Sequence, residues 1–460
     1  MFAAIQIAPV RLVLVFCPLV VLASFVLSGS ASAADSWPQW RGPQGQGHAA
    51  ARNLPLTWSE VENVAWKTKI PGRGWSSPVI EDGVIWLTTA LETKAAETER
   101  VKRLKSNTGD QPLTVADKVS FRAVGVDLQT GRLLHDIELF NQHQPQWVHA
   151  INSYASPTPV VDNGRLYCHF GTFGTVALDT LDGKLLWRNH ELRIMHENGP
   201  GSSPLLWRNL VIVHCDGSDE QYIVALDQKT GKVVWKTDRS GKLPDNIQLK
   251  KAYCTPLIAT IEGRELLLSP AADWLYGYDP STGHELWKLS YGVLGFSNVP
   301  RPVMQDDTIY LSTGFMEAQM LAVRLSGPAG AGNQRITWRY RKQVSKVPSP
   351  LLVDQQLYFV SDNGVATCLD VQDGRPLWVK RLGGKFVASP LYADGRIYFY
   401  NRSGTTFVLR PGRQYQLLAT NKLATGIWAS PAAVDRALYV RTEEALYRLQ
   451  LSTDSSAGDR

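Results

Sequence analysis

The chain has 460 residues, of which 44% are hydrophobic and 20% charged, a composition typical of a globular protein with a large core. Its 48 basic and 42 acidic residues give a formal net charge of +6, and Lys and Arg form no dense run. This mild, dispersed charge argues against nucleic acid or an anionic membrane surface as the main partner.

The first 33 residues are predicted to be a signal peptide. Arg11 precedes an apolar run over residues 12–27, and small residues follow up to Ala33. The run is shorter than the ~20 residues that span a bilayer, and the small residues suit cleavage after Ala33. We therefore expect an exported protein, periplasmic or secreted. Membrane association would follow only if this segment stayed uncleaved.

After an N-terminal extension, residues 34–57, a short motif recurs along the chain. A small residue and a proline precede an apolar stretch, and Arg301-Pro302 fills one gap in the series. The other anchors are Ser77-Pro78, Ser156-Pro157, Ser203-Pro204, Thr255-Pro256, Ser349-Pro350, Ser389-Pro390 and Ser430-Pro431. Most are about 40 to 50 residues apart, which indicates one repeat unit per anchor.

Each anchor leads into the same succession of short segments. After the anchor come an apolar stretch, a turn such as Asp82-Gly83 and an aromatic strand. A later strand ends in Asp before a Gly-containing turn and a Trp, as in Asp227, Gly231 and Trp235. In such a turn Asp caps the amides and Gly takes a positive φ. Four short β segments per unit predict a propeller blade, with the Trp wedged between blades.

The outer strands show how the ring would close. Tryptophans or degenerate equivalents mark the outer strand of each unit except the last, which ends at Leu449, and Trp66 lies upstream of the first anchor. We expect this N-terminal outer strand to complete the final blade and remove a free edge. The prediction is an all-β, eight-bladed β-propeller of four-stranded antiparallel blades over residues 58–450, followed by a flexible C-terminal tail, residues 451–460.

The anchors and units such as Ala225-Leu-Asp227, Thr230-Gly231-Lys232 and Trp235 resemble the repeats of the pyrroloquinoline-quinone (PQQ)-like propeller superfamily. The resemblance runs from about Trp58 to Tyr447. This superfamily includes quinoprotein alcohol dehydrogenases and BamB, a scaffold of outer-membrane assembly. The opening Trp37-Pro-Gln-Trp40-Arg-Gly-Pro43 also resembles the start of exported PQQ-like proteins of planctomycete-type bacteria. Because the superfamily holds both enzymes and scaffolds, the resemblance implies a fold and leaves the function open.

The dehydrogenases of this superfamily hold PQQ between a tryptophan and a disulfide of adjacent cysteines, with Ca²⁺ on Glu, Asn and Asp. This sequence has no adjacent cysteines, and no ordered Glu/Asn/Asp set lines up with that pattern. We therefore predict no cofactor, with PQQ and Ca²⁺ as the alternative. Four cysteines are expected to be buried free thiols: Cys168, Cys215, Cys254 and Cys368.

Loops around the central channel are the expected binding site. In this strand order, the loops before the inner strands and those between the second and third strands emerge on one face. They supply the candidate ligand- or partner-binding residues Trp75, Trp147, His149, His196, Asn198, Asp216, Lys251, Asp273, Trp274, Arg301, Asp362, Lys385, Arg402 and Trp428. This mixture suits a peptide or a small planar ligand, while ordinary propeller loops are the alternative. No catalytic residue is predicted, and the histidines fit no compact metal motif.

An insertion, residues 91–118, interrupts the first unit, with a charged helix expected over residues 91–104. Insertions on one face of a repeat array often add binding specificity, and a solvated surface loop is the alternative. We predict an exported monomeric scaffold that binds a protein or peptide partner through its channel face. One alternative is a PQQ- and Ca²⁺-dependent dehydrogenase or other small-ligand enzyme. Another is a carbohydrate-binding module, which only the tryptophans support.

Overall fold

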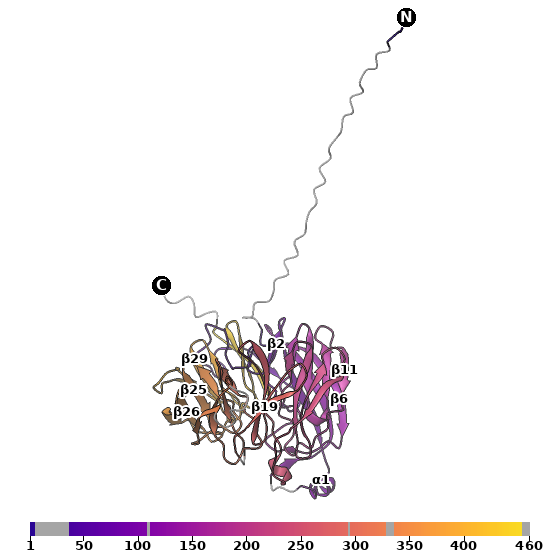
Figure 1. Ribbon diagram of the computed structural model, residues 1–460. Coiled ribbons are helices and arrows are strands. Elements are labelled where there is room, and N and C mark those ends of the chain that lie inside the picture. Colours follow the sequence, from indigo (N-terminus) through magenta and orange to yellow (C-terminus); the bar gives the residue numbers. More distant parts are fainter. Residues whose placement is uncertain (5–35, 108–110, 293–294, 328–334, 453–460) are drawn as a thin grey trace, which may run out of the picture. The chain divides into compact units, whose positions relative to one another are not determined.

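A computed structural model describes residues 1–4, 36–107, 111–292, 295–327 and 335–452. The predicted signal peptide, apart from its first four residues, and most of the predicted C-terminal tail lie outside them. The chain divides into two compact units after Ala31, and the second unit holds all the strands. Within this second unit the strands form eight four-stranded antiparallel sheets, which confirms the eight-bladed β-propeller. Figure 1 shows the ring of sheets from the side.

The first seven blades are built from consecutive strands that run in order from the channel outward. Their bounds are β2 (Val79–Glu81), β3 (Val84–Lys94), β5 (Ala116–Asp127) and β6 (Leu133–His143) in blade 1; β8 (Val160–Asp162), β9 (Arg165–His169), β10 (Thr175–Asp179) and β11 (Leu185–Asn189) in blade 2; β12 (Leu205–Trp207), β13 (Leu210–Asp216), β14 (Gln221–Asp227) and β15 (Val233–Asp238) in blade 3; β16 (Leu257–Ile261), β17 (Arg264–Pro270), β18 (Trp274–Tyr278) and β19 (Glu285–Ser290) in blade 4; β20 (Val303–Gln305), β21 (Thr308–Ser312), β22 (Met320–Arg324) and β23 (Ile336–Tyr340) in blade 5; β24 (Leu351–Val353), β25 (Gln356–Val360), β26 (Val365–Asp370) and β27 (Pro376–Arg381) in blade 6; β28 (Leu391–Ala393), β29 (Arg396–Tyr400), β30 (Thr405–Leu409) and β31 (Leu417–Lys422) in blade 7.

Blade 8 combines strands from both ends of the propeller. It contains β32 (Ala432–Val434), β33 (Ala437–Arg441), β34 (Ala445–Gln450) and β1 (Val64–Lys69). β1 pairs antiparallel with β34, with Trp66 opposite Arg448. The N-terminal strand therefore closes the ring as the outer strand of the last blade, as the sequence predicted.

The core lies between neighbouring blades, because the middle strands are buried on both faces. In β13 every residue is buried, and alternate side chains point to opposite faces of the sheet. Val211 and Val213 pack in the cluster shared with blade 2, whereas Leu210 and Ile212 pack in the cluster shared with blade 4. The four cysteines of the described chain are free and buried, as expected, and Cys168, Cys215 and Cys368 lie in such layers.

The recurring Asp, Gly and Trp form the joint between neighbouring blades. Asp227 Oδ1 accepts the Thr230 N–H at 2.9 Å, and Gly231 follows with a φ of +68°. Trp187 of the preceding blade packs on Gly231, where an added Cβ would lie 2.4 Å from the indole, and donates its Nε1–H to Gln228 O at 2.8 Å. The Gly is required both for the turn and for this close approach.

We expect Gly231→Ala to destabilise the propeller by about 3 kcal/mol or more, because a left-handed backbone strain of about 1 to 2 kcal/mol adds to overpacking against Trp187. Gly263→Ala is the matched control, since Gly263 has a φ of +76° but open space around its added Cβ. Urea unfolding of both variants measures the difference. Equal destabilisation would show that the indole contact contributes nothing.

The anchor hydroxyls link the blades in a circle of hydrogen bonds around the channel. In each bond the backbone N–H of one anchor donates to the hydroxyl of the next, at 2.9 or 3.0 Å: Ser77 to Thr158, Thr158 to Ser203, Ser203 to Thr255, Arg301 to Ser349, Ser349 to Ser389, Ser389 to Ser430 and Ser430 to Ser77. The series is interrupted after Thr255, because the next anchor residue, Arg301, has no side-chain hydroxyl to accept a hydrogen bond. We call this circle the belt.

In blade 2 the belt corrects the predicted anchor. Thr158-Pro159, not Ser156-Pro157, precedes the inner strand β8, and the Thr158 hydroxyl makes the belt contact. Ser156 lies two residues earlier and donates to Asn152 Oδ1 at 2.5 Å. The sequence Ser-Pro-Thr-Pro offers both registers, and only the pairing of β8 distinguishes them.

Residues 37–49, which we call the plug, close one end of the channel. Trp37 and Ile80 of blade 1 exchange backbone hydrogen bonds of 2.8 Å, and Ala49 N–H donates to Tyr392 O of blade 7 at 2.9 Å. Between them, Gln46 Oε1 accepts the N–H of Met304 in blade 5 at 3.0 Å. Blades 1 and 5 lie on opposite sides of the eight-bladed ring, so the plug crosses the channel. The sequence indicated only an extension here.

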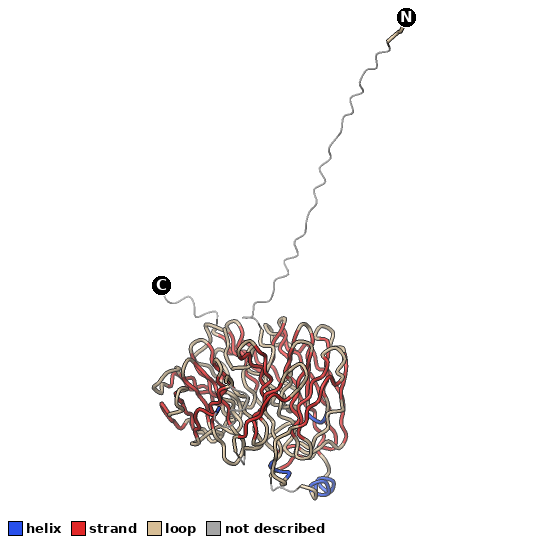
Figure 2. The backbone as a smooth tube through the Cα atoms, viewed as in Figure 1, coloured by secondary structure: helices blue, strands red, loops and turns tan. Residues whose placement is uncertain are grey.

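The insertion in blade 1 begins as a lengthened hairpin. β3 continues to Lys94 and β5 starts at Ala116, so the helix expected from residue 91 begins only at Glu97, as α1 (Glu97–Leu104). α1 lies at the lower face in Figures 1 and 2. Short elements complete the described chain: β4 (Leu113–Thr114), its partner β7 (Val148–His149), and 3-10 turns η2 (Gly171–Phe173) and η3 (Ile247–Leu249). Among the described residues, no helix has the length and apolar character to span a bilayer.

Candidate binding cavity

A cavity of about 570 Å³ occupies the centre of the ring. Every blade contributes lining residues, and so do the plug and the insertion: Trp40, Trp75, Ser77, Gln111, His149, Ile151, Asn152, Ser156, Thr158, Asn198, Gly201, Ser203, Gln248, Leu249, Lys251, Tyr253, Phe296, Ser297, Val299, Phe315, Met316, Lys346, Val347, Val387, Trp428 and Ser430. Trp40 Nε1 donates to Ser430 Oγ of the belt at 3.3 Å, so plug and belt form the floor.

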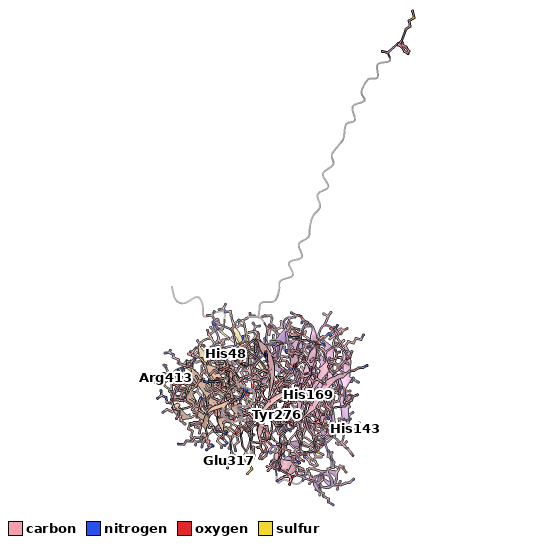
Figure 3. The ribbon with its side chains drawn as sticks, viewed as in Figure 1. His48, His143, His169, Tyr276, Glu317 and Arg413 are labelled. Carbon is pink, nitrogen blue, oxygen red and sulfur yellow. The ribbon has the colours of Figure 1, made fainter. Side chains whose placement is uncertain are left out.

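The opposite end of the cavity is its mouth. Phe315 and Met316, in the loop after β21, are 55% and 58% exposed there. Figure 3 shows His48 of the plug and Glu317, the neighbour of Met316, near opposite faces of the ring. A ligand would therefore enter from the face that carries the insertion.

Five of the predicted binding residues line the cavity: Trp75, His149, Asn198, Lys251 and Trp428. Three more lie directly behind or beside lining groups. The Arg402 guanidinium lies 4.0 Å from the centre of the Trp428 ring. Asp362 Oδ1 accepts the Val347 N–H at 3.0 Å, and Lys385 Nζ donates to Asn363 Oδ1 at 2.6 Å.

The remaining predicted residues are engaged in the fold. Asp216 forms a buried ion pair with Arg239 at 3.0 Å, because its side chain turns into the blade 3–4 layer. Arg301 donates to Trp40 O at 3.1 Å below the floor. Asp273 Oδ1 accepts the Gly295 N–H at 2.8 Å, and Trp274 Nε1 donates to Lys242 O at 3.1 Å.

His196 and Trp147 also lie outside the cavity wall. His196 is 2% exposed, and its Nε2 accepts the Thr172 N–H at 3.2 Å. Burial lowers the pKa of His196 to about 3, so its ring is neutral at neutral pH. Trp147 does not line the cavity, and its Nε1 is buried without a hydrogen-bond partner in the described part of the chain.

Sequence reasoning missed several lining residues. Trp40 comes from the plug, which no repeat pattern places. Phe315 and Met316 follow the second strand of blade 5, a position that the loop argument covers, so their place in the chain was the available signal. Lys346 and Phe296, by contrast, lie in loops before inner strands, where the loop argument expects channel-face residues, and both line the cavity.

Two tryptophans form a stacked pair at the junction of blades 8 and 1. The rings of Trp75 and Trp428 are 4.8 Å apart and 9° from parallel. Arg73 covers the pair on the Trp75 side at 5.3 Å, and Arg402 covers it on the Trp428 side. Trp428 Nε1 also donates to Glu443 Oε1 at 2.7 Å. Such a stack holds its exposed edge in place before any ligand binds.

The cavity wall is basic. Lys251 and Lys346 contribute amino groups, and none of the lining residues in the described chain is Asp or Glu. Burial lowers the pKa of His149, which favours the neutral imidazole. The ionised side chains facing the cavity are therefore cationic.

This donor set does not fit a quinone held with Ca²⁺. Ca²⁺ binds carboxylate and carbonyl oxygens, and the described lining supplies no carboxylate. The described residues also contain no cluster of three or more His, Cys, Asp or Glu able to hold a metal ion. The four cysteines lie buried as free thiols rather than stacked as a disulfide over a ligand.

Asp362 should make stability depend on pH. Burial is the main cause that raises its pKa to about 6, above the usual value of about 3.9. The folded state therefore holds this proton more tightly, and stability falls as pH rises from about 4 through 6. We expect Asp362→Asn to be more stable than the parent by about 1 to 2 kcal/mol above pH 6, with the advantage vanishing near pH 4. Urea unfolding across this range measures it, and an advantage that persists at pH 4 would contradict the cause given.

The fold and the cavity together define an eight-bladed β-propeller whose channel is closed at one end and open at the other. A family described as outer membrane protein assembly factor BamB matches residues 125–380 and 329–445. The chain therefore belongs to this PQQ-like repeat β-propeller family.

Individual relatives agree with this assignment. BamB of Moranella endobia is 23% identical over 250 residues, covering 54% of this chain and 59% of that protein. The crystal structure of BamB from Moraxella catarrhalis aligns with a TM-score of 0.52 and 16% identity, over 78% of this chain and 100% of that one. A europium-containing methanol dehydrogenase aligns with a TM-score of 0.60 and 11% identity, over 90% of each chain. At these identities the two solved structures support the fold alone.

Proposed function

We propose that this protein is an exported, monomeric scaffold that binds a segment of a partner protein in its central cavity. The observation that carries the proposal is a preformed cavity, built by every blade, with a floor and an open mouth. Its volume falls in the range of about 300 to 1,000 Å³ usual for ligand sites, which is too small for a folded domain. An extended peptide segment fits such a space.

The family supports a protein partner. The matching family and the Moranella endobia relative carry the name of an outer membrane protein assembly factor, although a quinohemoprotein alcohol dehydrogenase of Pseudomonas putida also matches 31% of this chain at 28% identity. The predicted signal peptide supports export, and periplasmic or secreted placement follows from it. A PQQ-dependent dehydrogenase gains no support from the cavity, since the described lining residues supply no carboxylate for Ca²⁺.

Site-specific photo-crosslinking tests the proposal. A photoreactive phenylalanine analogue replaces Met316 at the mouth or, as the matched control, Val234 on the outer strand β15, which is 52% exposed. We expect a discrete adduct with a partner protein from Met316 alone, with the crosslinked peptide identified by mass spectrometry. Adducts of equal yield from both positions, or none from Met316, would contradict cavity binding.

A further inference from the structure

The walls of the channel contain buried cations whose hydrogen-bond partners are neutral. Arg441 is 3% exposed and donates to Ser76 O, Ser76 Oγ and Thr88 O at 2.9, 2.7 and 3.0 Å. Lys251 lines the cavity, is 3% exposed and donates to the side-chain oxygen of Gln248. Burial lowers the pKa of both side chains, and at Lys251 the nearby buried Glu197 opposes this effect only in part.

The floor repeats this arrangement. Arg41 of the plug is 2% exposed and donates to Gln46 O and Pro350 O, while its Nε and Nη1 have no partner among the described residues. Arg301 is 1% exposed and contacts Gln39 Oε1 and Trp40 O. Burial, together with repulsion from Arg301, lowers the pKa of Arg41 to about 9. These acceptors are amides and carbonyls.

Elsewhere the protein pairs a buried cation with a carboxylate. The side chains of Arg239 and Asp216 are 2% and 1% exposed and 3.0 Å apart. Unpaired buried charges are costly, and effective protein dielectrics let them act over many ångströms. Among the lining residues, the charged side chains that an occupant of the cavity would meet are therefore those of Lys251 and Lys346. Asp362 interacts with Lys346 at the rim, but its Oδ1 is held by the Val347 N–H.

The apolar part of the wall lies beside the two lysines. Lys346 Nζ lies 4.8 Å from the ring centre of Phe315, and Phe296 and Tyr253 continue this surface. Trp75 and Trp428 line the blade 1–8 side. An occupant that offered only charge would leave these rings uncovered, whereas one that offered only apolar groups would leave the lysines unpaired.

We propose that the cavity selects an extended acidic segment of the partner, whose carboxylates bind Lys251 and Lys346 and whose apolar side chains pack on the adjacent rings. This inference rests on the proposed function and adds the chemistry of the partner. Charge-assisted hydrogen bonds to carboxylates would supply the selectivity, and the aromatic surface would supply contact area.

Three synthetic peptides test the charge preference. Each has ten residues with Phe or Leu at alternate positions, and the other positions are Glu in the first, Gln in the second and Lys in the third. Binding is followed by anisotropy of a label on the peptide. We expect the Glu peptide to bind at least about tenfold more tightly than the Gln peptide, with affinity that falls as salt rises. The Lys peptide should bind most weakly.

Lysine variants assign the effect to the cavity. Lys346→Met and Lys251→Met should each weaken the Glu peptide about three- to tenfold and leave the Gln peptide unchanged. Lys236→Met is the control, because Lys236 lies on outer strand β15 beside Glu220, at 3.3 Å. Thermal unfolding shows whether each variant is folded. Lys346 is only partly buried, so this variant keeps the test valid if Lys251→Met unfolds.

The outcomes separate this inference from the proposed function. Equal affinity for the Glu and Gln peptides would overturn the acidic preference, while a Met316 crosslink would still support partner binding. Failure of the Glu peptide to bind, with PQQ alone binding in a Lys251-dependent way, would overturn the peptide in favour of a small anionic ligand. An affinity loss in Lys236→Met equal to that in Lys346→Met would also overturn it.

Discussion

Replacing Arg239 with leucine is expected to lower the free energy of unfolding by about 3 to 5 kcal/mol, because it leaves Asp216 buried without its counter-charge. Arg239 Nε donates to Asp216 Oδ1 at 3.0 Å, and its other nitrogens donate to Tyr278 Oη at 3.0 Å and Ser269 Oγ at 2.8 Å. One side chain thus joins blade 3 to blade 4. Urea unfolding of the variant measures the loss.

The loss should depend on pH with a defined sign. Burial alone would raise the pKa of Asp216, but Arg239 and His214 together hold it below its usual value. The parent keeps this stabilisation above about pH 4 and loses it as pH falls further. In the variant only His214 still opposes the effect of burial on the pKa of Asp216, so the difference in stability between the two proteins should be widest at neutral pH and should narrow towards acid.

An exposed pair provides the control. Arg208 contacts Glu265 at 2.8 Å, with side chains 68% and 38% exposed. Arg208→Leu should change stability by at most about 1 kcal/mol. If both variants lost the same stability, burial of the Arg239 pair would not be the cause.

Trp37→Ala is expected to destabilise the protein by about 3 to 5 kcal/mol and to loosen the plug. Trp37 is 1% exposed and its ring packs over Gly42, where an added Cβ would lie 2.8 Å away. Hydrogen exchange should accelerate at the hydrogen-bonded amides of Gly45, Gly47 and Ala49.

A substitution at the surface serves as the control, because it shortens a large apolar side chain without affecting the plug. Leu181 is 89% exposed, and Leu181→Ala should stay within about 0.5 kcal/mol of the parent. Faster exchange across all blades of Trp37→Ala, without a larger change in the plug, would contradict a local role for Trp37.

The repeat pattern predicted the architecture because each motif residue has a structural role that depends on its immediate neighbours. Asp227, Gly231 and the indole of Trp187 make one joint, and the same joint recurs around the ring. Closure by the Trp66 strand followed from counting outer strands. The register of blade 2 was wrong because Ser156 and Thr158 both precede a proline, and a side-chain hydroxyl alone does not show which one meets the neighbouring blade.

The site was less predictable, since loop position does not determine side-chain direction. Trp75 and Lys251 face the cavity from the loops before inner strands. Asp216 lies at the end of β13, on the same face of the ring, yet its side chain pairs with Arg239 instead of facing the cavity. Nothing in the sequence around Asp216 indicates this ion pair. The plug was missed because residues 37–49 make their contacts with strands some 40 to 350 residues away, and only the folded ring brings those strands together.

The shared sheet of β1 and β34 sets the order in which the molecule can be completed. β1 is the first strand to be synthesised and β34 the last, yet Gln450 N–H donates to Asn63 O at 2.9 Å in the finished ring. Until β34 emerges, β1 has no strand to pair with, and the layers that border blade 8 are incomplete. Closure of the ring is thus a late step, and loss of either β1 or β34 would leave blade 8 incomplete, with an open edge available for aggregation.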